Sequence, residues 1–392
     1  MPMSSATLEK VEERLALFLD QLMQVKGVRH AVAAVESRDA SFQWAKARGD
    51  LDPDGTPMSV DSPFWIASVT KLFIATSILR LHEMGRLSIE DSVIEYLPES
   101  WLQGVHVVNG QDYGSYLTLR HLLSHASGLP DYLELKAFEG QTLIDRVFRG
   151  EDMAWSIDDI LGIVRDARAP HFAPQSVDQS RYRVRYSDTN FQILIAILEQ
   201  VTGQSIDRVF DQWIYQPLGL TQTAHPPRPG ESMSTEAATI WVGDHAFSDK
   251  PLALRSFGDL LSTSSDMVTF MRGLLEGEVF ERPETFQLMN SNFQSLDFGF
   301  SPVAPGWPIQ YGVGMMRFAM PRLFSPFYVT PPLIGHTGAV ASWLFYCAPL
   351  DLILAGTMGQ LTAAPAPFRL LPKLLRDLER LGVHRGSDAN GG

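Results

Sequence analysis

The sequence has 392 residues, of which 45% are hydrophobic and 20% are charged, and this predicts a globular protein with a sizeable core and room for two subdomains. Its net charge of -13 argues against nucleic acid and against an anionic membrane as a partner. The single cysteine, Cys347, excludes an intrachain disulfide and a cysteine-based metal cluster.

The chain begins with a predicted helix and a predicted hairpin. Residues 8–25 carry an apolar stripe with the spacing of an amphipathic helix. Residues 30–35 and 41–46 have the composition of two short paired strands. No basic segment leads into an apolar run, and no apolar stretch is long enough to cross a bilayer. We therefore expect a cytoplasmic protein without a membrane partner.

A helix is predicted to begin near Ser68 and to end at Gly85, after an apolar run. Ser68 and Lys71 are three residues apart, so the hydroxyl and the amine share one helical face and can meet. In the first turn, the helix dipole favours negative charge near Ser68 and disfavours the protonated form of Lys71. Such a pair is typical of an activated serine nucleophile, although about one Ser-x-x-Lys match is expected by chance in a chain of this length.

The remaining elements follow from apolar periodicity and from glycine and proline breaks. Helices are predicted at 119–125, 157–167, 191–202 and 206–215, and residues 168–181 are expected to form a loop over the site. Strands are predicted at 311–315, 335–338, 342–348 and 352–357, followed by a helix at 368–381 and a frayed tail at 386–392.

This order of elements predicts an α+β fold in which an antiparallel sheet is flanked by terminal helices and interrupted by a mainly helical insertion. We expect residues 1–66 and 255–392 to form one α/β subdomain that is split in sequence. Residues 67–254 would form the helical subdomain, and the site would lie at the interface of the two.

A polar cluster at residues 186–190 (Tyr-Ser-Asp-Thr-Asn) directly precedes one of the predicted helices. One interpretation is structural: Asp188 or the threonine after it caps the helix, and Tyr186 is partly buried. The other places the Tyr186 hydroxyl beside Ser68 and Lys71, where a nearby cation would lower its pKa and let it relay protons. The residues alone leave both interpretations open.

Residues 336–338 (His-Thr-Gly) lie on a predicted strand with a glycine on either side of the His-Thr pair. Glycines in a strand mark a bend or a place where backbone comes close to another group. The functional interpretation is a strand that borders the substrate, with a backbone N–H near Gly338 or Ala339 directed at a developing oxyanion.

The order Ser-x-x-Lys, Tyr-Ser-Asp, His-Thr-Gly resembles that of the serine β-lactamase and penicillin-recognising enzyme superfamily. The resemblance is closest to the class C-like branch, which includes D,D-carboxypeptidases, D-amino acid amidases, family VIII-type esterases and acyltransferases. It covers roughly residues 28–380 and includes matching segments outside the three motifs, at 85–98, 119–129, 258–267 and 311–315. It implies a β-lactamase/transpeptidase-like fold.

The resemblance also implies roles for the residues that match its motifs. Ser68 would be the nucleophile that carries the acyl group, and Lys71 and Tyr186 would be the general acid and base, in an order that the sequence leaves open. The N–H groups of Ser68 and Ala339 would form the oxyanion hole. His336 would lie at the side of the pocket, near the leaving group or a substrate carboxylate.

Two positions depart from the pattern of many β-lactamases. Asp188 stands where they have Asn, and an ionised Asp accepts hydrogen bonds but cannot donate them. His336 stands where they have Lys, and a histidine is only partly charged near neutral pH. Both changes argue against efficient β-lactam hydrolysis and are compatible with peptidase, amidase or esterase members.

The sequence therefore predicts a serine hydrolase that forms an acyl-enzyme on Ser68 and cleaves a small ester, amide or short peptide, with no metal or organic cofactor. The alternatives are an acyltransferase that uses the same acyl-enzyme, a β-lactamase, and a non-catalytic binding protein, which the intact motifs disfavour. The oligomeric state is left open. Aromatic residues that could line an acyl pocket, or belong to the core, are Trp155, Phe172, Tyr182, Trp241, Trp307 and Phe318.

Overall fold

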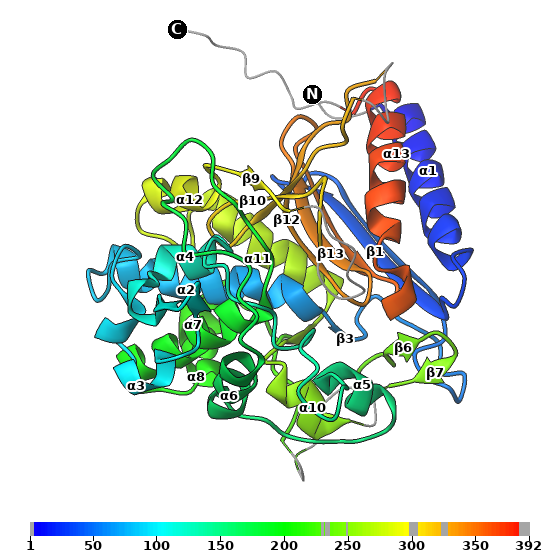
Figure 1. Cartoon of the computed structure of the whole chain (residues 1–392). Coiled ribbons are helices and arrows are strands. Elements are labelled where there is room, and N and C mark those ends of the chain that lie inside the picture. The colour runs from blue at the N-terminus through cyan, green and yellow to red at the C-terminus, as the bar shows by residue number, and fades with distance from the viewer. Residues whose placement is uncertain are drawn as a thin grey trace, which may run out of the picture.

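The computed structural model describes residues 4–228, 231, 236–247, 250–297, 305–322 and 328–383. Within them, one antiparallel sheet contains β1 (His30–Ser37), β2 (Gln43–Gly49), β9 (Gln294–Ser295), β10 (Gln310–Tyr311), β11 (Met316–Phe318), β12 (Leu333–Gly338), β13 (Ser342–Cys347) and β14 (Leu352–Thr357). These eight strands have the order β2-β1-β14-β13-β12-β11-β10-β9 (Figure 1). Because β1 pairs with β14, the N-terminal hairpin and the C-terminal strands form a single sheet.

Each face of the sheet packs against its own hydrophobic core. Successive side chains of a strand point to opposite faces and so enter the two cores alternately. In β13, Trp343, Phe345 and Cys347 belong to a core that includes side chains of α1 (Ser5–Met23) and α13 (Ala366–Arg380). These two helices lie side by side over one face of the sheet (Figure 1). The residues between them in β13 belong to a second core on the other face, where α11 (Ser264–Glu276) packs. Two covered faces explain why the central strands β13 and β14 are buried along their whole length.

The region between the hairpin and β9 is mainly helical, and α2 (Thr70–Glu83) is its central helix. Eleven of the residues of α2 are buried, so this helix is enclosed on nearly all sides. It packs against α7 (Asp188–Thr202), α8 (Ile206–Phe210), α12 (Pro283–Met289) and β12. The other helices are α3 (Glu99–Leu102), α4 (Leu119–Leu123), α5 (Leu143–Phe148), α6 (Ile157–Ala167), α9 (Gln216–Leu218) and α10 (Pro251–Ser256).

Three short strand pairs connect segments outside the main sheet. They are β3 (Phe64–Trp65) with β8 (Leu261–Ser262), β4 (Val107–Val108) with β5 (Gln111–Asp112), and β6 (Trp241–Val242) with β7 (His245–Ala246). Among the described residues, no helix combines the length and the apolarity needed to cross a membrane.

The predicted fold class is confirmed, and so are the N-terminal hairpin and the bounds of α6 and β14. The thiol of Cys347 is buried. The strand predicted at 311–315 is wrong beyond its first residue. Gly314 has φ 73°, and a Cβ there would lie 2.1 Å from the Cβ of Ala75, so the chain turns against α2 at this point. The strand β11 was not predicted. The predicted tail at 386–392 lies outside the described residues, and the division into two subdomains stays a prediction.

Candidate active site

Ser68 lies in η1 (Ala67–Val69), a single 3₁₀ turn between β3 and α2, and not in the first turn of α2 as expected. Ala67, directly before it, has φ 47°, in the left-handed region that alanine rarely adopts. This backbone turns the chain from the strand into the helix at the serine. The Ser68 Oγ accepts a hydrogen bond from Lys71 Nζ at 3.0 Å, so the two heads meet as their spacing predicts.

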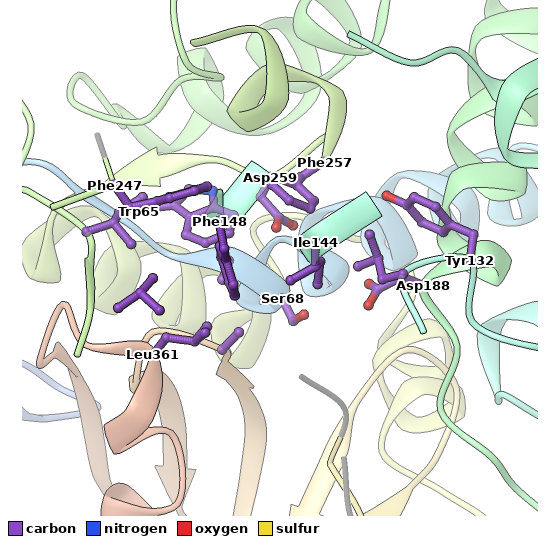
Figure 2. A pocket seen from close by; sticks show the side chains of 15 residues that line it. Trp65, Ser68, Tyr132, Ile144, Phe148, Asp188, Phe247, Phe257, Asp259 and Leu361 are labelled. Carbon is purple, nitrogen blue, oxygen red and sulfur yellow. The ribbon is translucent and has the colours of Figure 1, made fainter. Parts of the chain in front are cut away.

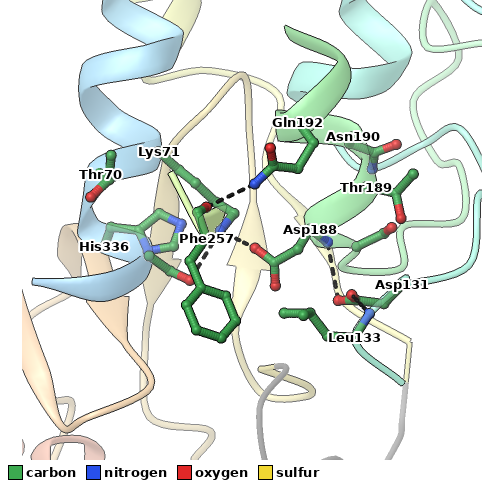
Figure 3. A network of polar contacts seen from close by, with 12 residues as sticks. Thr70, Lys71, Asp131, Leu133, Asp188, Thr189, Asn190, Gln192, Phe257 and His336 are labelled. Carbon is green, nitrogen blue, oxygen red and sulfur yellow. Dashed lines mark hydrogen bonds and ion pairs between the residues drawn. The ribbon is translucent and has the colours of Figure 1, made fainter. Parts of the chain in front are cut away.

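Lys71 is almost completely buried and forms an ion pair with the carboxylate of Asp188, at the start of α7 (Figure 3). Burial by itself would lower the pKa of Lys71. The carboxylates of Asp188 and Asp259 outweigh burial and raise that pKa above its ordinary value. Lys71 is therefore an ammonium in the resting site. The expectation that the site disfavours protonated Lys71 is wrong, because two nearby carboxylates raise the Lys71 pKa.

Tyr186 is buried beside this ion pair, and its ring centroid lies 5.2 Å from Lys71 Nζ. Its hydroxyl makes no hydrogen bond of regular geometry within the described residues. Burial raises the pKa of Tyr186 well above its ordinary value; the charge of Asp188 adds to the rise, and the hydroxyl of Ser68 acts against it. The expected lowering by a cation is therefore wrong: Tyr186 is a neutral phenol that holds its proton.

The position of Tyr186 depends on His125, which the sequence analysis did not single out as a site residue. The two ring centroids are 4.4 Å apart. His125 Nδ1 lies 3.2 Å from the backbone N of Ser187 and 2.9 Å from Asn190 Nδ2, so it accepts hydrogen bonds from both. Burial lowers the pKa of His125 well below its ordinary value, so its ring is neutral. Ser187 and Asn190 thus hold the His125 ring in place, and this ring packs against Tyr186.

Asp188 does not cap α7, and neither does the threonine after it. The N-cap position is Ser187, whose side chain makes no capping hydrogen bond. The backbone N of Asp188 donates instead to Asp131 Oδ2 at 3.0 Å, and Asp131 Oδ1 accepts from the backbone N of Leu133 (Figure 3). Burial raises the pKa of Asp131 well above its ordinary value, and the charge of Asp188 adds to it. The capping group comes from a distant loop, which leaves the Asp188 carboxylate free to face Lys71.

His336 lies on β12 and is completely buried. Its Nε2 is 3.1 Å from the Tyr311 hydroxyl, and its Nδ1 is 2.7 Å from the carbonyl oxygen of Thr337. Burial lowers the pKa of His336 to about 3, and the charge of Lys71 acts in the same direction, so the imidazole is neutral. It packs behind Lys71 and is not among the residues that line the pocket. A contact between His336 and substrate stays a prediction that this packing does not favour.

The end of β12 is pressed against the Ser68 turn. A Cβ on Gly338 would lie 2.2 Å from Ser342 Oγ and 2.4 Å from the carbonyl oxygen of Ile66, so only glycine fits. Ser342 Oγ donates to the same Ile66 oxygen at 2.8 Å. This confirms the close backbone approach that the glycine predicts and brings Ala339 to the pocket beside Ser68.

A pocket opens at Ser68 and is mainly apolar (Figure 2). Its polar side chains include Ser68 and two carboxylates, Asp188 and Asp259. None of the six aromatic residues proposed from the sequence lines it. The remaining lining residues are Trp65, Ala67, Tyr132, Leu133, Ile144, Phe148, Ile240, Val242, Phe247, Phe257, Ala339 and Leu361. Within the described part of the chain, no group of three or more His, Cys, Asp or Glu side chains is arranged to hold a metal ion.

Asp259 is the pocket residue that the sequence analysis missed and that carries charge. It lies in one of the family-like segments, at 258–267, but nothing in the local pattern separates it from an ordinary loop residue. Burial raises the pKa of Asp259 to about 7; the charge of Lys71 lowers it, and that of Asp188 raises it. Its carboxylate makes no hydrogen bond or ion pair with any residue that the structure describes.

Comparison with known proteins places this chain in a family. A family model described as Beta-lactamase matches residues 15–367. Esterase EstB of Burkholderia gladioli is 34% identical over 213 residues, which are 53% of this chain and 50% of EstB. The carboxypeptidase/endopeptidase AmpH of Escherichia coli (strain K12) is 24% identical over 333 residues, which are 83% of this chain and 78% of AmpH.

The chain spans 50–63% of the length of EstB and of two penicillin-binding-protein relatives from Bacillus subtilis. Among solved structures, the D-amino acid amidase from Ochrobactrum anthropi SV3 complexed with L-phenylalanine amide is similar, with a TM-score of 0.73 and 18% identity. That similarity covers 94% of this chain and 99% of the amidase, and it shows a shared fold. Since the family model spans nearly the whole sequence, the chain belongs to the Beta-lactamase family.

Proposed function

We propose that this protein is a serine hydrolase that cleaves a small ester or amide through an acyl-enzyme on Ser68. The observation that carries the proposal is the 3.0 Å contact of Ser68 Oγ with Lys71 Nζ at a mainly apolar pocket that Ser68 lines. The similarity to EstB, AmpH and the amidase structure supports the same class of reaction.

The ion pair of Lys71 and Asp188 defines a path for the serine proton. An ammonium has no lone pair with which to accept a proton, so Lys71 acts as a relay. As Ser68 Oγ forms a bond to the carbonyl carbon, its proton passes to Lys71 while Lys71 passes one to Asp188. The electron pair of the carbonyl bond moves to its oxygen, where the N–H groups of Ser68 and Ala339 stabilise the charge.

Tyr186 completes acylation, because a phenol with a raised pKa keeps its proton until a strong base appears. When the tetrahedral intermediate collapses, the bond to the leaving oxygen or nitrogen breaks and Tyr186 donates its proton to that atom. The proton held by Asp188 returns through Lys71 to the phenolate. Water then attacks the acyl group on Ser68 by the reverse sequence of transfers, which releases the acid and restores the serine.

Intact-mass spectrometry with a fluorophosphonate and with simple chromogenic esters tests this proposal. We expect one covalent adduct on the wild-type chain, mapped to Ser68, and ester turnover that Ser68→Ala abolishes. Ser291→Ala, at an exposed serine, is the matched control and should keep both. Labelling at another residue, or ester turnover that survives Ser68→Ala, would overturn the assignment.

A further inference from the structure

Asp259 has no part in the proton transfers proposed above, yet the backbone holds it firmly at the pocket. The residue that follows it, Leu260, is fixed from two sides. Its N–H donates to Thr70 Oγ1 at 2.9 Å, and its carbonyl oxygen accepts from the N–H of Ile66 at 2.9 Å. Both contacts lead to the start of the Ser68 turn and of α2. A carboxylate is thus held beside the nucleophile by the elements that position the nucleophile.

The charges around the pocket do not balance. Two carboxylates line it, those of Asp188 and Asp259, and none of the described lining residues is basic. In the part of the chain that the structure describes, the cation of the site is Lys71, which is buried and already paired with Asp188. Among the described residues, an ionised Asp259 therefore makes no hydrogen bond or ion pair, and only the charge of Lys71, which Asp188 already neutralises, offsets it. Such a group is costly in the free protein and attracts a cation.

A second polar group faces the same space, and the described residues offer it only an interaction with the Trp155 side chain that lacks regular hydrogen-bond geometry. Tyr132 is 1% exposed and lines the pocket, and its hydroxyl makes no hydrogen bond of regular geometry within the described residues. Figure 2 shows the Tyr132 ring reaching across towards the side on which Asp259 lies. A buried hydroxyl without a regular hydrogen bond costs free energy and can accept a hydrogen bond from an ammonium.

The aromatic walls have the same preference for positive charge. Trp65 and Phe257 lie with ring centroids 5.7 Å apart, and both line the pocket with Asp259. The face of an aromatic ring attracts a cation, and the attraction grows where water is excluded. Carboxylate, hydroxyl and ring faces together form the lining of a site for an apolar amine.

We propose that Asp259, with the Tyr132 hydroxyl and the aromatic walls, binds an ammonium group on the acyl part of the substrate, so that the preferred substrates are esters or amides of hydrophobic amino acids. This inference rests on the proposed hydrolase function. Because Ser68 and Asp259 line one pocket, the ammonium and the scissile carbonyl belong to the same bound molecule. The same charge repels substrates that carry a carboxylate at that position, such as penicillins.

A matched pair of substrates tests the inference: phenylalanine methyl ester, as both enantiomers, and methyl 3-phenylpropanoate, which lacks only the amine. At pH 7.0 we expect the wild-type kcat/KM for one enantiomer of the amino ester to exceed that for methyl 3-phenylpropanoate by about tenfold, since a hydrogen bond to a charged group is worth about 1.5–3 kcal/mol. Asp259→Asn should reduce this ratio about tenfold, mainly through KM. Asp166→Asn, an exposed aspartate in α6, removes the same charge and should leave the ratio unchanged.

A wild-type enzyme that does not prefer the amino ester would overturn the inference even if Asp259→Asn failed to fold. An unchanged ratio in a folded Asp259→Asn variant would overturn it too. Calorimetry separates the hydrolase proposal from the ammonium-site proposal. It compares the binding of 2-phenylethylamine with that of 2-phenylethanol to the Ser68→Ala variant. Preferential binding of the amine without any acyl-enzyme in the wild type would contradict the hydrolase and support the ammonium site. Ester turnover with equal binding of both compounds would do the reverse.

Discussion

Two aspartates line the same pocket, and their surroundings differ in one respect. Asp188 forms an ion pair with the Lys71 ammonium, which fixes the position of its carboxylate. Asp259 forms no hydrogen bond or ion pair within the described residues. Burial dominates the pKa of Asp259 and raises it to about 7. A paired carboxylate can hold and return a proton without leaving its place, while an unpaired one is free to meet a ligand. The proposed roles in chemistry and in recognition follow from this difference.

Replacing Lys71, whose charge acts on both aspartates, should have the largest effect. Lys71→Ala takes away the relay between Ser68 and Asp188 and leaves both pocket carboxylates without a counter-charge. We expect kcat/KM for a simple ester to fall by about 10²–10⁴-fold, measured by initial rates, with Lys10→Ala at an exposed position of α1 as the control. Activity within a few-fold of wild type would contradict a relay through Lys71.

Asp188→Asn should have the next largest effect, because it breaks a buried ion pair. Asn can neither neutralise Lys71 nor accept its proton, so we expect ester turnover at pH 7 to fall by about 10²-fold. The Lys71 pKa, which Asp188 raises in the wild type, should also fall, so the rate of the variant should climb with pH while that of the wild type changes little. Stopped-flow acylation rates from pH 6 to 10 would show the difference. Parallel pH profiles would argue against the proposed relay.

Some features of the fold and the site are predictable from the sequence and others are not, and the reason is physical. Ser68 and Lys71 meet through local helical geometry, and β13, β14 and α6 follow from local apolar patterns, so sequence reasoning predicted them. Asp259 reaches the nucleophile only because β8 pairs with β3, across nearly two hundred residues of chain.

Protonation states were also misjudged, since they depend on distant charges and on burial. The pKa of Lys71 follows carboxylates on other segments, and that of Tyr186 follows its enclosure by His125 and its other neighbours. His336 is predictable as a strand residue but not as a buried one, because its partner Tyr311 lies on β10, beyond the strand next to it in the sheet. Patterns along the chain carry no information on these long-range contacts.

Asp259→Asn and Asp188→Asn should change stability in opposite directions, and this is the most discriminating of the expected effects. The folded pKa of Asp259, about 7, lies above its ordinary value of 3.8, so between these values the folded state binds more protons than the unfolded state. The wild type therefore loses stability as pH rises through this window. Asp259→Asn avoids the loss and should raise the free energy of unfolding by roughly 1–3 kcal/mol at pH 8 and by little near pH 4.

Asp188→Asn should instead destabilise the fold at both pH 6 and pH 8, by up to about 3–5 kcal/mol, since it leaves a buried ammonium unpaired. Urea unfolding of the two variants and the wild type at each pH measures the contrast. Destabilisation by Asp259→Asn at pH 8 would mean that this carboxylate has a stabilising partner in the folded protein. In that case Asp259 would not be unpaired, and the proposed affinity of Asp259 for an ammonium would lose its basis. The proposed role of Asp188 as the partner of Lys71 would stand unchanged.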